Sequence, residues 1–372
     1  MKKIKLNSAC MTSIGKLDSS YLGILLDAAN AVLSDIDPGS ISSVFISSFA
    51  PESLCGIERP LETVANELRA AHPGLDAPFH GLYQTGGEAL FECLERFPGG
   101  TVLVLGCEKM THLDARRSSG ILSRTVNPHD RGYGATLPSL GALVTRLYQE
   151  RYSIPDSAFH RVAVKNHANA MFNPKAQFHK RITVGDVERS PLVADPLRRL
   201  HCAPVSDGAV ALLLGRDGDG ISMSGWGRGI DMPLFQERAR LERFRATAAA
   251  CHAALAASGV RRSDIDIVEI HDAFSPFELI NLEEMGFYPA GNAWRALEAG
   301  ELDIGGQRAV NPSGGLKARG HPIGVCGLSS VVELFSQLTG TAGDRQHGGA
   351  RTGIIQSAGG VSTTSYVFIL EQ

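Results

Sequence analysis

Apolar positions follow two different periods along the chain, and together these periods predict an α/β fold. Segments with apolar residues at helical spacing lie at 20–33, 61–71, 85–97 and 328–338. Short runs of apolar and β-branched residues, which are typical of strands, lie between them, at 3–9, 41–47, 101–106, 206–215, 221–225 and 266–270. Strands that alternate with helices predict a sheet with helices on its faces.

The pattern changes in the middle of the chain. From about residue 109 to residue 200, His, Arg, Asn and Pro become more frequent and the regular periodicity fades. We expect a loop-rich insert that carries substrate contacts over a rigid scaffold. The predicted organisation is an N-terminal half at 1–110 plus 201–220, an inserted loop domain at 111–200, and a C-terminal half at 221–372.

Part of the first half recurs in the second. Residues 28–48 align with residues 252–272 without gaps, and each copy reads as a helix, a short polar turn and a strand. Ile41 falls on Ile265, and Ile46 falls on Ile270. The repeat predicts two similar α/β halves that pack together, with active groups near the seam.

Composition narrows the class of protein. The chain has 372 residues, which is long for one core, and its 43% apolar and 20% charged residues are typical of globular proteins. A net charge of −3 gives no sign of nucleic acid or an anionic membrane as a partner. The apolar runs fall short of the roughly 20 residues that span a bilayer. No apolar region follows the basic start, so we expect no signal peptide.

The cysteines and histidines lack metal-site spacing. The seven cysteines are scattered and contain no CxxC pair, which argues against a disulfide framework and a structural zinc site. Asp and His do not occur at ligand spacing either, so we expect no metal. A reducing compartment, by default the cytoplasm, fits this cysteine usage.

The densest chemical signal is the loop Asn311–Gly327, which reads NPSGGLKARGHPIGVCG. Its glycines indicate backbone with positive φ or close approach to another group. The helix predicted at 328–338 follows directly. We therefore expect His321 at a helix N-terminus, where free N–H groups favour partial negative charge. A tight loop with a capping histidine is the alternative.

Two further places resemble parts of an active site. His271 ends a predicted strand, where ligands usually bind in α/β folds, although it could equally be bonded to backbone. Gly359 and Gly360 interrupt two predicted strands, and their N–H groups could serve an oxyanion. A hairpin with a glycine bulge explains the same pair.

Seven motifs in order make the chain similar to the thiolase superfamily, most of all to sterol-carrier-protein-type thiolases and thiolase-like aldolases. The motifs are Ile14-Gly-Lys, Leu105-Gly-Cys-Glu-Lys-Met, Lys165-Asn-His with Asn173-Pro-Lys-Ala-Gln-Phe, Cys202-Ala-Pro-Val-Ser-Asp-Gly-Ala, His271-Asp-Ala-Phe with Glu278-Leu, the loop Asn311–Gly327, and Ser357-Ala-Gly-Gly. The resemblance implies a thiolase-like fold: two similar α/β/α-layered halves with an inserted loop domain.

The resemblance also implies roles for individual residues. His321 matches the histidine that activates the nucleophile and helps to bind the thioester oxygen. His271 matches the position that completes the enolate-binding oxyanion hole, and Gly359 matches the backbone N–H of a second hole. Gly360 and Asn311 are further backbone candidates, and Lys165, His167 and Phe274 are candidates for substrate binding. Coenzyme A thioesters are the implied substrates, with no tightly bound cofactor.

The chain departs from the family where the acyl-accepting cysteine is expected. The family motif is Cys-x-Ser/Thr-Gly, and this chain has Tyr83-Gln-Thr-Gly, or Gln84 if the alignment slips by one residue. The second reactive position corresponds to Ser357. A phenol with a pKa of about 10 and a serine hydroxyl are poor substitutes for a thiolate. Cys55 and Cys93 are distant in sequence.

Three functions remain open from the sequence. We favour C–C chemistry on acyl-CoA without an acyl-enzyme, such as aldol cleavage or decarboxylation, with Tyr83 moving a proton. The alternatives are an acyl-CoA C-acyltransferase, of the acetyl-CoA acetyltransferase type, and a catalytically silent acyl-CoA-binding subunit. The resemblance implies a homodimer or homotetramer, and a small OB-fold/zinc-ribbon protein as a partner.

Overall fold

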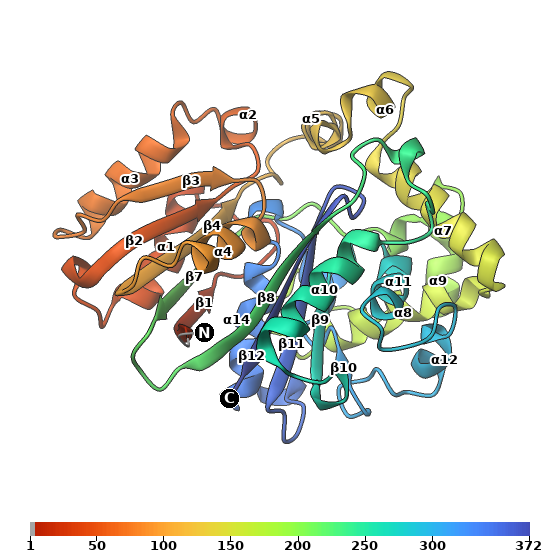
Figure 1. The fold of residues 1–372 in the computed structure, drawn as a ribbon. Helices are drawn as coiled ribbons and strands as arrows, with labels where there is room; N and C mark the ends of the chain where they lie inside the picture. The colour runs from red at the N-terminus through yellow and green to blue at the C-terminus, as the bar shows by residue number, and fades with distance from the viewer. Residues whose placement is uncertain (1–3) are drawn as a thin grey trace.

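A mixed β-sheet runs through the whole molecule and joins two similar halves (Figure 1). The computed structural model describes residues 4–372, so Lys3, the first residue of a predicted strand, lies outside them. Within the described residues the sheet has ten strands in the order β10-β9-β11-β12-β8-β1-β7-β4-β2-β3. These strands are β1 (Ile4–Met11), β2 (Ile41–Ser47), β3 (Phe79–Tyr83), β4 (Thr101–Glu108), β7 (Gly208–Gly215), β8 (Ile221–Ile230), β9 (Ile267–Ile270), β10 (Ala309–Val310), β11 (Thr352–Gly359) and β12 (Thr364–Glu371).

The two halves of this sheet have the same strand order. The N-terminal half runs β3-β2-β4-β7-β1 and the C-terminal half runs β10-β9-β11-β12-β8. Antiparallel pairing of Ile4–Leu6 in β1 with Ile221–Met223 in β8 joins them. Helix α1 (Tyr21–Leu33), the 3-10 turn η1 (Pro38–Ser40) and β2 correspond to α10 (Arg245–Ser258), η5 (Arg262–Asp264) and β9, in line with the predicted repeat.

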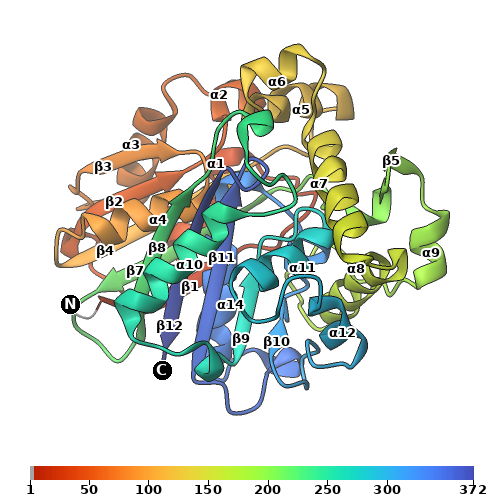
Figure 2. The same cartoon turned by 45° about the vertical axis from the view of Figure 1, so that its right-hand side comes forward.

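Helices form three layers around the two half-sheets (Figures 1 and 2). Helices α1 and α3 (Pro60–Ala71) pack on the outer face of the N-terminal half. Helices α10 and α11 (Ser275–Glu284) pack on the outer face of the C-terminal half. Helices α4 (Gly86–Glu95) and α14 (Leu328–Leu338) lie between the halves, because each contacts strands of both. The thiolase-like α/β layering predicted from the sequence is confirmed.

The central helix α14 shows why the apolar period was a good guide. Leu328, Val331, Leu334 and Leu338 recur at helical spacing, and all four are buried. Truncation of one such leucine to alanine costs about 2–5 kcal/mol, because a cavity is left in the core. The burial fixes the axis of α14 and therefore the loop that precedes it.

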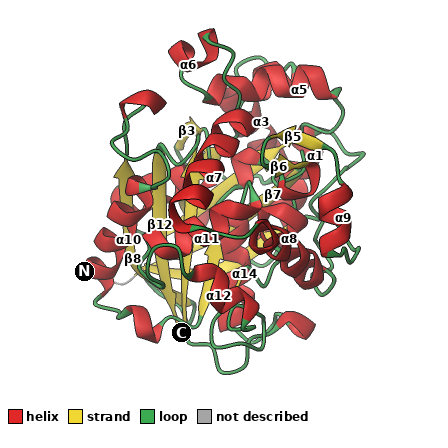
Figure 3. Cartoon of the chain, turned by 90° about the vertical axis from the view of Figure 1, so that its right-hand side faces the viewer, coloured by secondary structure: helices red, strands yellow, loops and turns green. Residues whose placement is uncertain are grey.

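The middle segment differs from the loop-rich insert that we expected. It contains the long helices α7 (Leu137–Tyr152) and α8 (Asp156–Ala170), which pack beside α11 (Figures 2 and 3). The smaller elements are α5 (Ala115–Leu122), η2 (Ser123–Thr125), α6 (Pro128–Gly132), α9 (Val184–Arg189), β5 (Leu192–Ala194), β6 (Leu197–Arg198) and η3 (Arg199–His201). The periodicity was hidden because α8 buries Lys165, Asn166 and Asn169, polar residues that find partners only in the folded chain.

The remaining elements are short. They are α2 (Pro51–Cys55), η4 (Phe235–Glu237), α12 (Ala293–Glu298), α13 (Gly315–Arg319), η6 (Ile323–Val325) and η7 (Gly343–Arg345). Among the described residues, no helix is long and apolar enough to cross a membrane.

Candidate active site

The ends of corresponding strands in the two halves meet at one cavity of about 580 Å³. Parallel strands end at the same edge of a sheet, so the residues that follow them gather there. Phe49, Gln84 and Met110 follow β2, β3 and β4 and line the cavity on one side. His271, which follows β9, and Gly359, which ends β11, line it on the other. The insert closes the cavity with residues 119–137.

His271 presents a defined tautomer to this cavity. Its Nδ1 atom accepts a hydrogen bond from the backbone N–H of Ala358 at 3.3 Å. In a neutral imidazole the other nitrogen then carries the proton, so Nε2–H is a donor. Burial, followed by the nearby His321, lowers the pKa of His271 well below its ordinary value, so the ring is neutral at physiological pH. His271 is therefore a neutral hydrogen-bond donor in a largely buried site.

His321 reaches the same cavity from the glycine-rich loop. Its backbone N–H donates to Ser206 Oγ at 2.8 Å, and its ring stands edge-on to the His271 ring, with 5.2 Å between ring centroids. Burial, and then Arg319, lower the pKa of His321 to about 4. The expected position at a helix N-terminus is wrong: His321 forms a bridge with Val205, and α14 begins only at Leu328.

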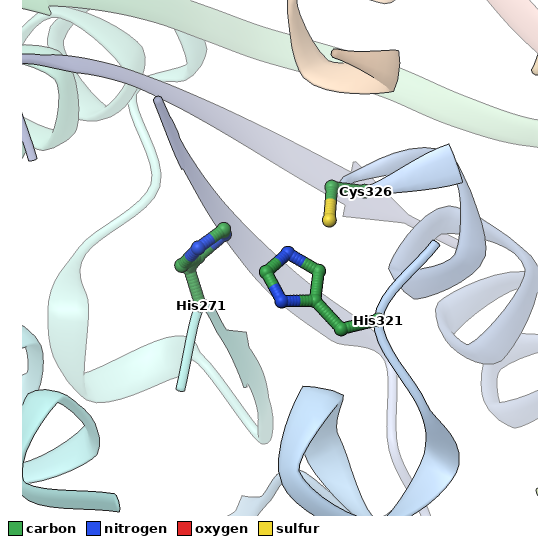
Figure 4. Close-up of side chains that lie close together, drawn as sticks. All are labelled: His271, His321 and Cys326. Atoms are coloured by element: carbon green, nitrogen blue, oxygen red, sulfur yellow. The ribbon is translucent and has the colours of Figure 1, made fainter. Parts of the chain in front are cut away.

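The structure adds a residue to this pair that the sequence analysis did not assign. Cys326 lines the cavity, and its Sγ lies within 4.8 Å of ring nitrogens of both His271 and His321 (Figure 4). Its carbonyl oxygen lies at the start of α4, 2.6 Å from where a Cβ on Gly86 would be. The signal was present as a cysteine in the same loop as His321. Sequence distance from Tyr83 hid it.

Among the described residues, these three side chains also form a candidate metal-binding cluster. Two imidazoles and one thiolate form a donor set that suits Zn²⁺. However, ligation through Nε2 of His271 would require its Nδ1 to carry the proton, and that atom faces the N–H of Ala358. The hydrogen bond therefore favours a proton on Nε2 over a metal.

Three other predicted residues line the cavity, and Ser357 does not. Phe274, Gly359 and Gly360 are all in its wall. Gly360 has a φ of +61°, and its turn joins β11 to β12. Ser357 lies behind the wall instead, with an exposure of 1%. Its hydroxyl lacks a hydrogen-bond partner among the described residues.

Tyr83 points away from the cavity. Its ring folds back over Gly81, whose Cβ, if present, would lie 2.9 Å from the ring, and it stacks near Phe45. Burial raises the pKa of Tyr83, and the charges of Arg96, Glu92 and Glu88, on and just after α4, modulate it. Gln84, the residue that follows β3, lines the cavity instead. The expectation that Tyr83 faces the reacting atoms is therefore corrected.

Lys165 and Asn311 hold the site from behind. Lys165 Nζ donates to the Val310 carbonyl at 2.7 Å and pairs with Glu278 at 3.2 Å, both buried. Asn311, at φ +50°, accepts from the N–H of Ile270 at 2.8 Å and donates to Glu278 at 2.7 Å. These contacts fix the end of β9, and with it His271. Neither side chain lines the cavity.

His167 is likewise outside the cavity. Its ring stacks on Phe178, and its Nδ1 lies 3.0 Å from the Lys180 carbonyl. Burial, followed by the charge of Lys317, lowers the pKa of His167 to about 4. These contacts make His167 part of the packing of the insert.

Two buried carboxyls hold the loop that carries His321 and Cys326. Asp272 accepts from the N–H of Leu316 at 2.6 Å, and a Cβ on Gly315 would lie 2.4 Å from its carboxylate. Glu108, at the end of β4, accepts from the N–H of Gly324 at 2.9 Å. Burial raises the pKa of each carboxyl to about 7. Position 315 thus requires a glycine, because any Cβ there would collide with Asp272, the residue after His271.

The fold and this site define the class of protein. The model of the thiolase N-terminal domain matches residues 8–217, and the thiolase C-terminal domain-like model matches residues 227–372. The chain belongs to the thiolase family, and it is an enzyme of the acyltransferase or lyase type within that superfamily.

Individual relatives carry different names. The chain is 31% identical to the acetyl-CoA acetyltransferase of Methanothermobacter thermautotrophicus over 100% of both chains. It is 33% identical to sterol carrier protein 2 of Gallus gallus, over 74% of this chain and 54% of that protein. The structure of the Ltp2-ChsH2(DUF35) aldolase matches with a TM-score of 0.81 at 22% identity, covering 100% of this chain and 98% of that one. This last likeness shows the fold alone.

Proposed function

We propose that the protein makes or breaks a C–C bond next to the thioester carbonyl of an acyl-CoA, as an aldolase does, without an acyl-cysteine intermediate. One observation carries the proposal. The entry to α4, where the family resemblance places the acyl-accepting cysteine, presents Gln84 and Thr85 to the cavity, while two neutral histidines face it from the other half.

The two histidines suit an enolate. Cleavage of the bond between the α- and β-carbons leaves negative charge on the thioester oxygen. The Nε2–H of His271 is fixed by the bond to Ala358 and can donate to that oxygen without reorganisation. His321 stands beside it and lines the same cavity. A single fixed donor of this kind contributes a factor of about 10²–10³ to the rate.

The cavity fits part of a thioester substrate. Its volume of about 580 Å³ lies within the usual range for ligand pockets. Phe274, Leu137 and Ile323 make parts of its wall apolar, which favours an acyl chain. Coenzyme A thioester is thus proposed as a substrate rather than a resident cofactor.

Acyl transfer is the second candidate. Two relatives with about 30% identity are named acetyl-CoA acetyltransferase, and Cys326 supplies a thiol to the cavity. A cysteine accepts an acyl group in its thiolate form, however. Burial raises the pKa of Cys326 far above its ordinary value, which disfavours that form. We therefore rank acyl transfer second.

Assembly belongs to the same proposal. The aldolase neighbour is a complex of Ltp2 with ChsH2, a DUF35 protein. We propose that this chain also works with a small protein of OB-fold/zinc-ribbon type, and that it forms at least a homodimer.

A product analysis with and without free coenzyme A tests the function. The purified chain is incubated with 3-hydroxyacyl-CoAs of rising chain length, and acyl-CoA and carbonyl products are measured by mass spectrometry. We expect cleavage that does not depend on free coenzyme A, and protein of unchanged mass. Thiolysis of a 3-ketoacyl-CoA that requires coenzyme A, together with an acylated cysteine, would contradict the proposal. Binding of acyl-CoA without either reaction would identify a silent subunit.

A further inference from the structure

In the cluster of His271, His321 and Cys326, only Cys326 has no role in the proposed C–C cleavage. In Figure 4 its sulfur points toward the His321 ring, and the ring of His271 lies on the other side of His321. The sulfur and the ring nitrogens lie within 4.8 Å of one another. A group placed so close to the expected enolate is within reach of the same substrate atoms.

The backbone around Cys326 is held rigidly. Ser47 Oγ donates to the Gly324 carbonyl at 2.6 Å, and the Glu108 carboxylate accepts from the Gly324 N–H at 2.9 Å. On the other side, Gly327 packs on Gly87 at the start of α4, where a Cβ would lie 2.9 Å from the Gly87 nitrogen. Precise placement of this kind is what proton transfer to carbon requires.

The surroundings hold all three side chains in their neutral forms. The N–H of Ala358 fixes the proton of His271 on Nε2. The pKa of His321 is lowered to about 4 by burial first and by Arg319 second. Burial also raises the pKa of the Cys326 thiol, so the sulfur keeps its proton. A neutral thiol is a poor nucleophile, but it can give its proton to a stronger base such as an enolate carbon.

We propose that Cys326 is the proton donor to the α-carbon of the enolate, and so a catalytic residue. The inference rests on the proposed function. In the cleavage direction, the bond between the α- and β-carbons breaks, and its electron pair forms the enolate. His321 takes the proton that leaves the β-hydroxyl. The S–H bond of Cys326 then breaks as a new C–H bond forms at the α-carbon. The proton on His321 passes to the thiolate, and the cluster returns to its starting state.

Deuterium exchange isolates this step from the rest of the reaction. In D₂O, the purified chain is incubated with propionyl-CoA alone, and mass spectrometry follows deuterium at the α-carbon. In the reverse of the proposed step, His321 first takes the thiol proton, the resulting thiolate takes the α-proton, and the new S–H proton then exchanges with solvent. We expect exchange well above buffer alone. Cys326→Ala should reduce it by about 100-fold or more, the usual weight of a general acid or base.

Matched variants separate chemistry from folding. Cys326→Ser keeps the size of the side chain, but its hydroxyl is a weaker acid, so exchange should fall by at least about tenfold. Cys10→Ser removes a thiol on β1, outside the cavity, and should exchange like the wild type. Thermal unfolding with and without propionyl-CoA shows whether each variant folds and still binds.

The outcomes distinguish this inference from the proposed function. Exchange at the wild-type rate in Cys326→Ala, or no exchange above buffer in the wild type, overturns the role of Cys326 and leaves C–C cleavage to be judged from its products. An acyl adduct that maps to Cys326 makes the residue a nucleophile and overturns both. Stoichiometric zinc that is lost in Cys326→Ala makes it a metal ligand and overturns the proton-donor role.

Discussion

The strand ends of the two halves occupy equivalent places in the sheet but carry different chemistry. In the N-terminal half, β2, β3 and β4 lead to Phe49, Gln84 and Met110, which are neutral wall residues. In the C-terminal half, β9 leads to His271, and β10 leads to the loop that carries His321 and Cys326.

The difference lies in what holds each strand end. The C-terminal loops are fixed by buried polar groups, such as Asp272 on Leu316 and Asn311 on Ile270. The N-terminal half contributes an anchor, because its Glu108 holds Gly324 of the opposite half. Under the proposed function, proton chemistry is thus concentrated in the C-terminal half, and the N-terminal half supplies wall and support.

Removal of the His271 ring is the severest test of this division. His271→Ala should lower kcat for C–C cleavage by about 10²–10³, because it deletes one fixed donor to the enolate oxygen. The affinity for acyl-CoA, measured by thermal shift, should change little. If kcat survived within a few fold, the C-terminal half would not hold the enolate.

The glycine at the junction of two motifs should be the next most sensitive. Gly315→Ala places a Cβ 2.4 Å from the Asp272 carboxylate at a φ of +60°, so we expect a loss of unfolding free energy of about 2–4 kcal/mol. Chemical denaturation measures it. Gly305→Ala, where a Cβ would meet nothing within 4 Å, is the matched control and should be nearly neutral.

Glu108, which holds Gly324 of the opposite half, should make the free energy of unfolding depend on pH. The pKa of Glu108 rises from 4.5 to about 7 on folding, because the group is buried. A carboxyl with a raised folded pKa binds its proton more tightly in the folded chain, so its stabilising contribution is present at low pH and is lost as pH rises from about 4.5 to 7.

Glu108→Gln cannot titrate and removes this loss. Relative to the wild type, the variant should gain about 3 kcal/mol in unfolding free energy between pH 4.5 and pH 8. Denaturation at several pH values measures the difference, with the exposed Glu58→Gln as control. Parallel stability curves for wild type and Glu108→Gln would show that the buried carboxyl does not couple to folding.

Tyr83 should give the smallest effect. Its ring folds over Gly81 and does not line the cavity. Tyr83→Phe should therefore change kcat less than about twofold, within the ordinary scatter of a substitution away from the site. A loss of tenfold or more in the cleavage assay would return the proton-transfer role to the N-terminal half.

The sequence alone determined many elements of the two halves and their order, but not the helices of the middle segment. Regular apolar spacing predicted α14 at its observed bounds, and the alignment of residues 28–48 with 252–272 anticipated the equivalent α1 and α10. Local spacing is enough for this, because burial of one helix face or one strand face leaves a periodic trace in the chain. The motifs also predicted His271, His321 and Gly359 as site residues, and all three line one cavity.

Only the tertiary structure decided which side chains face the cavity. Tyr83, the last residue of β3, does not line the cavity, whereas the next residue, Gln84, does. Lys165 and Asn311 belong to the family motifs, but their side chains bind the buried Glu278 of another element. Cys326 reaches both histidines through packing of the loop against the opposite half, a long-range contact that local spacing does not encode.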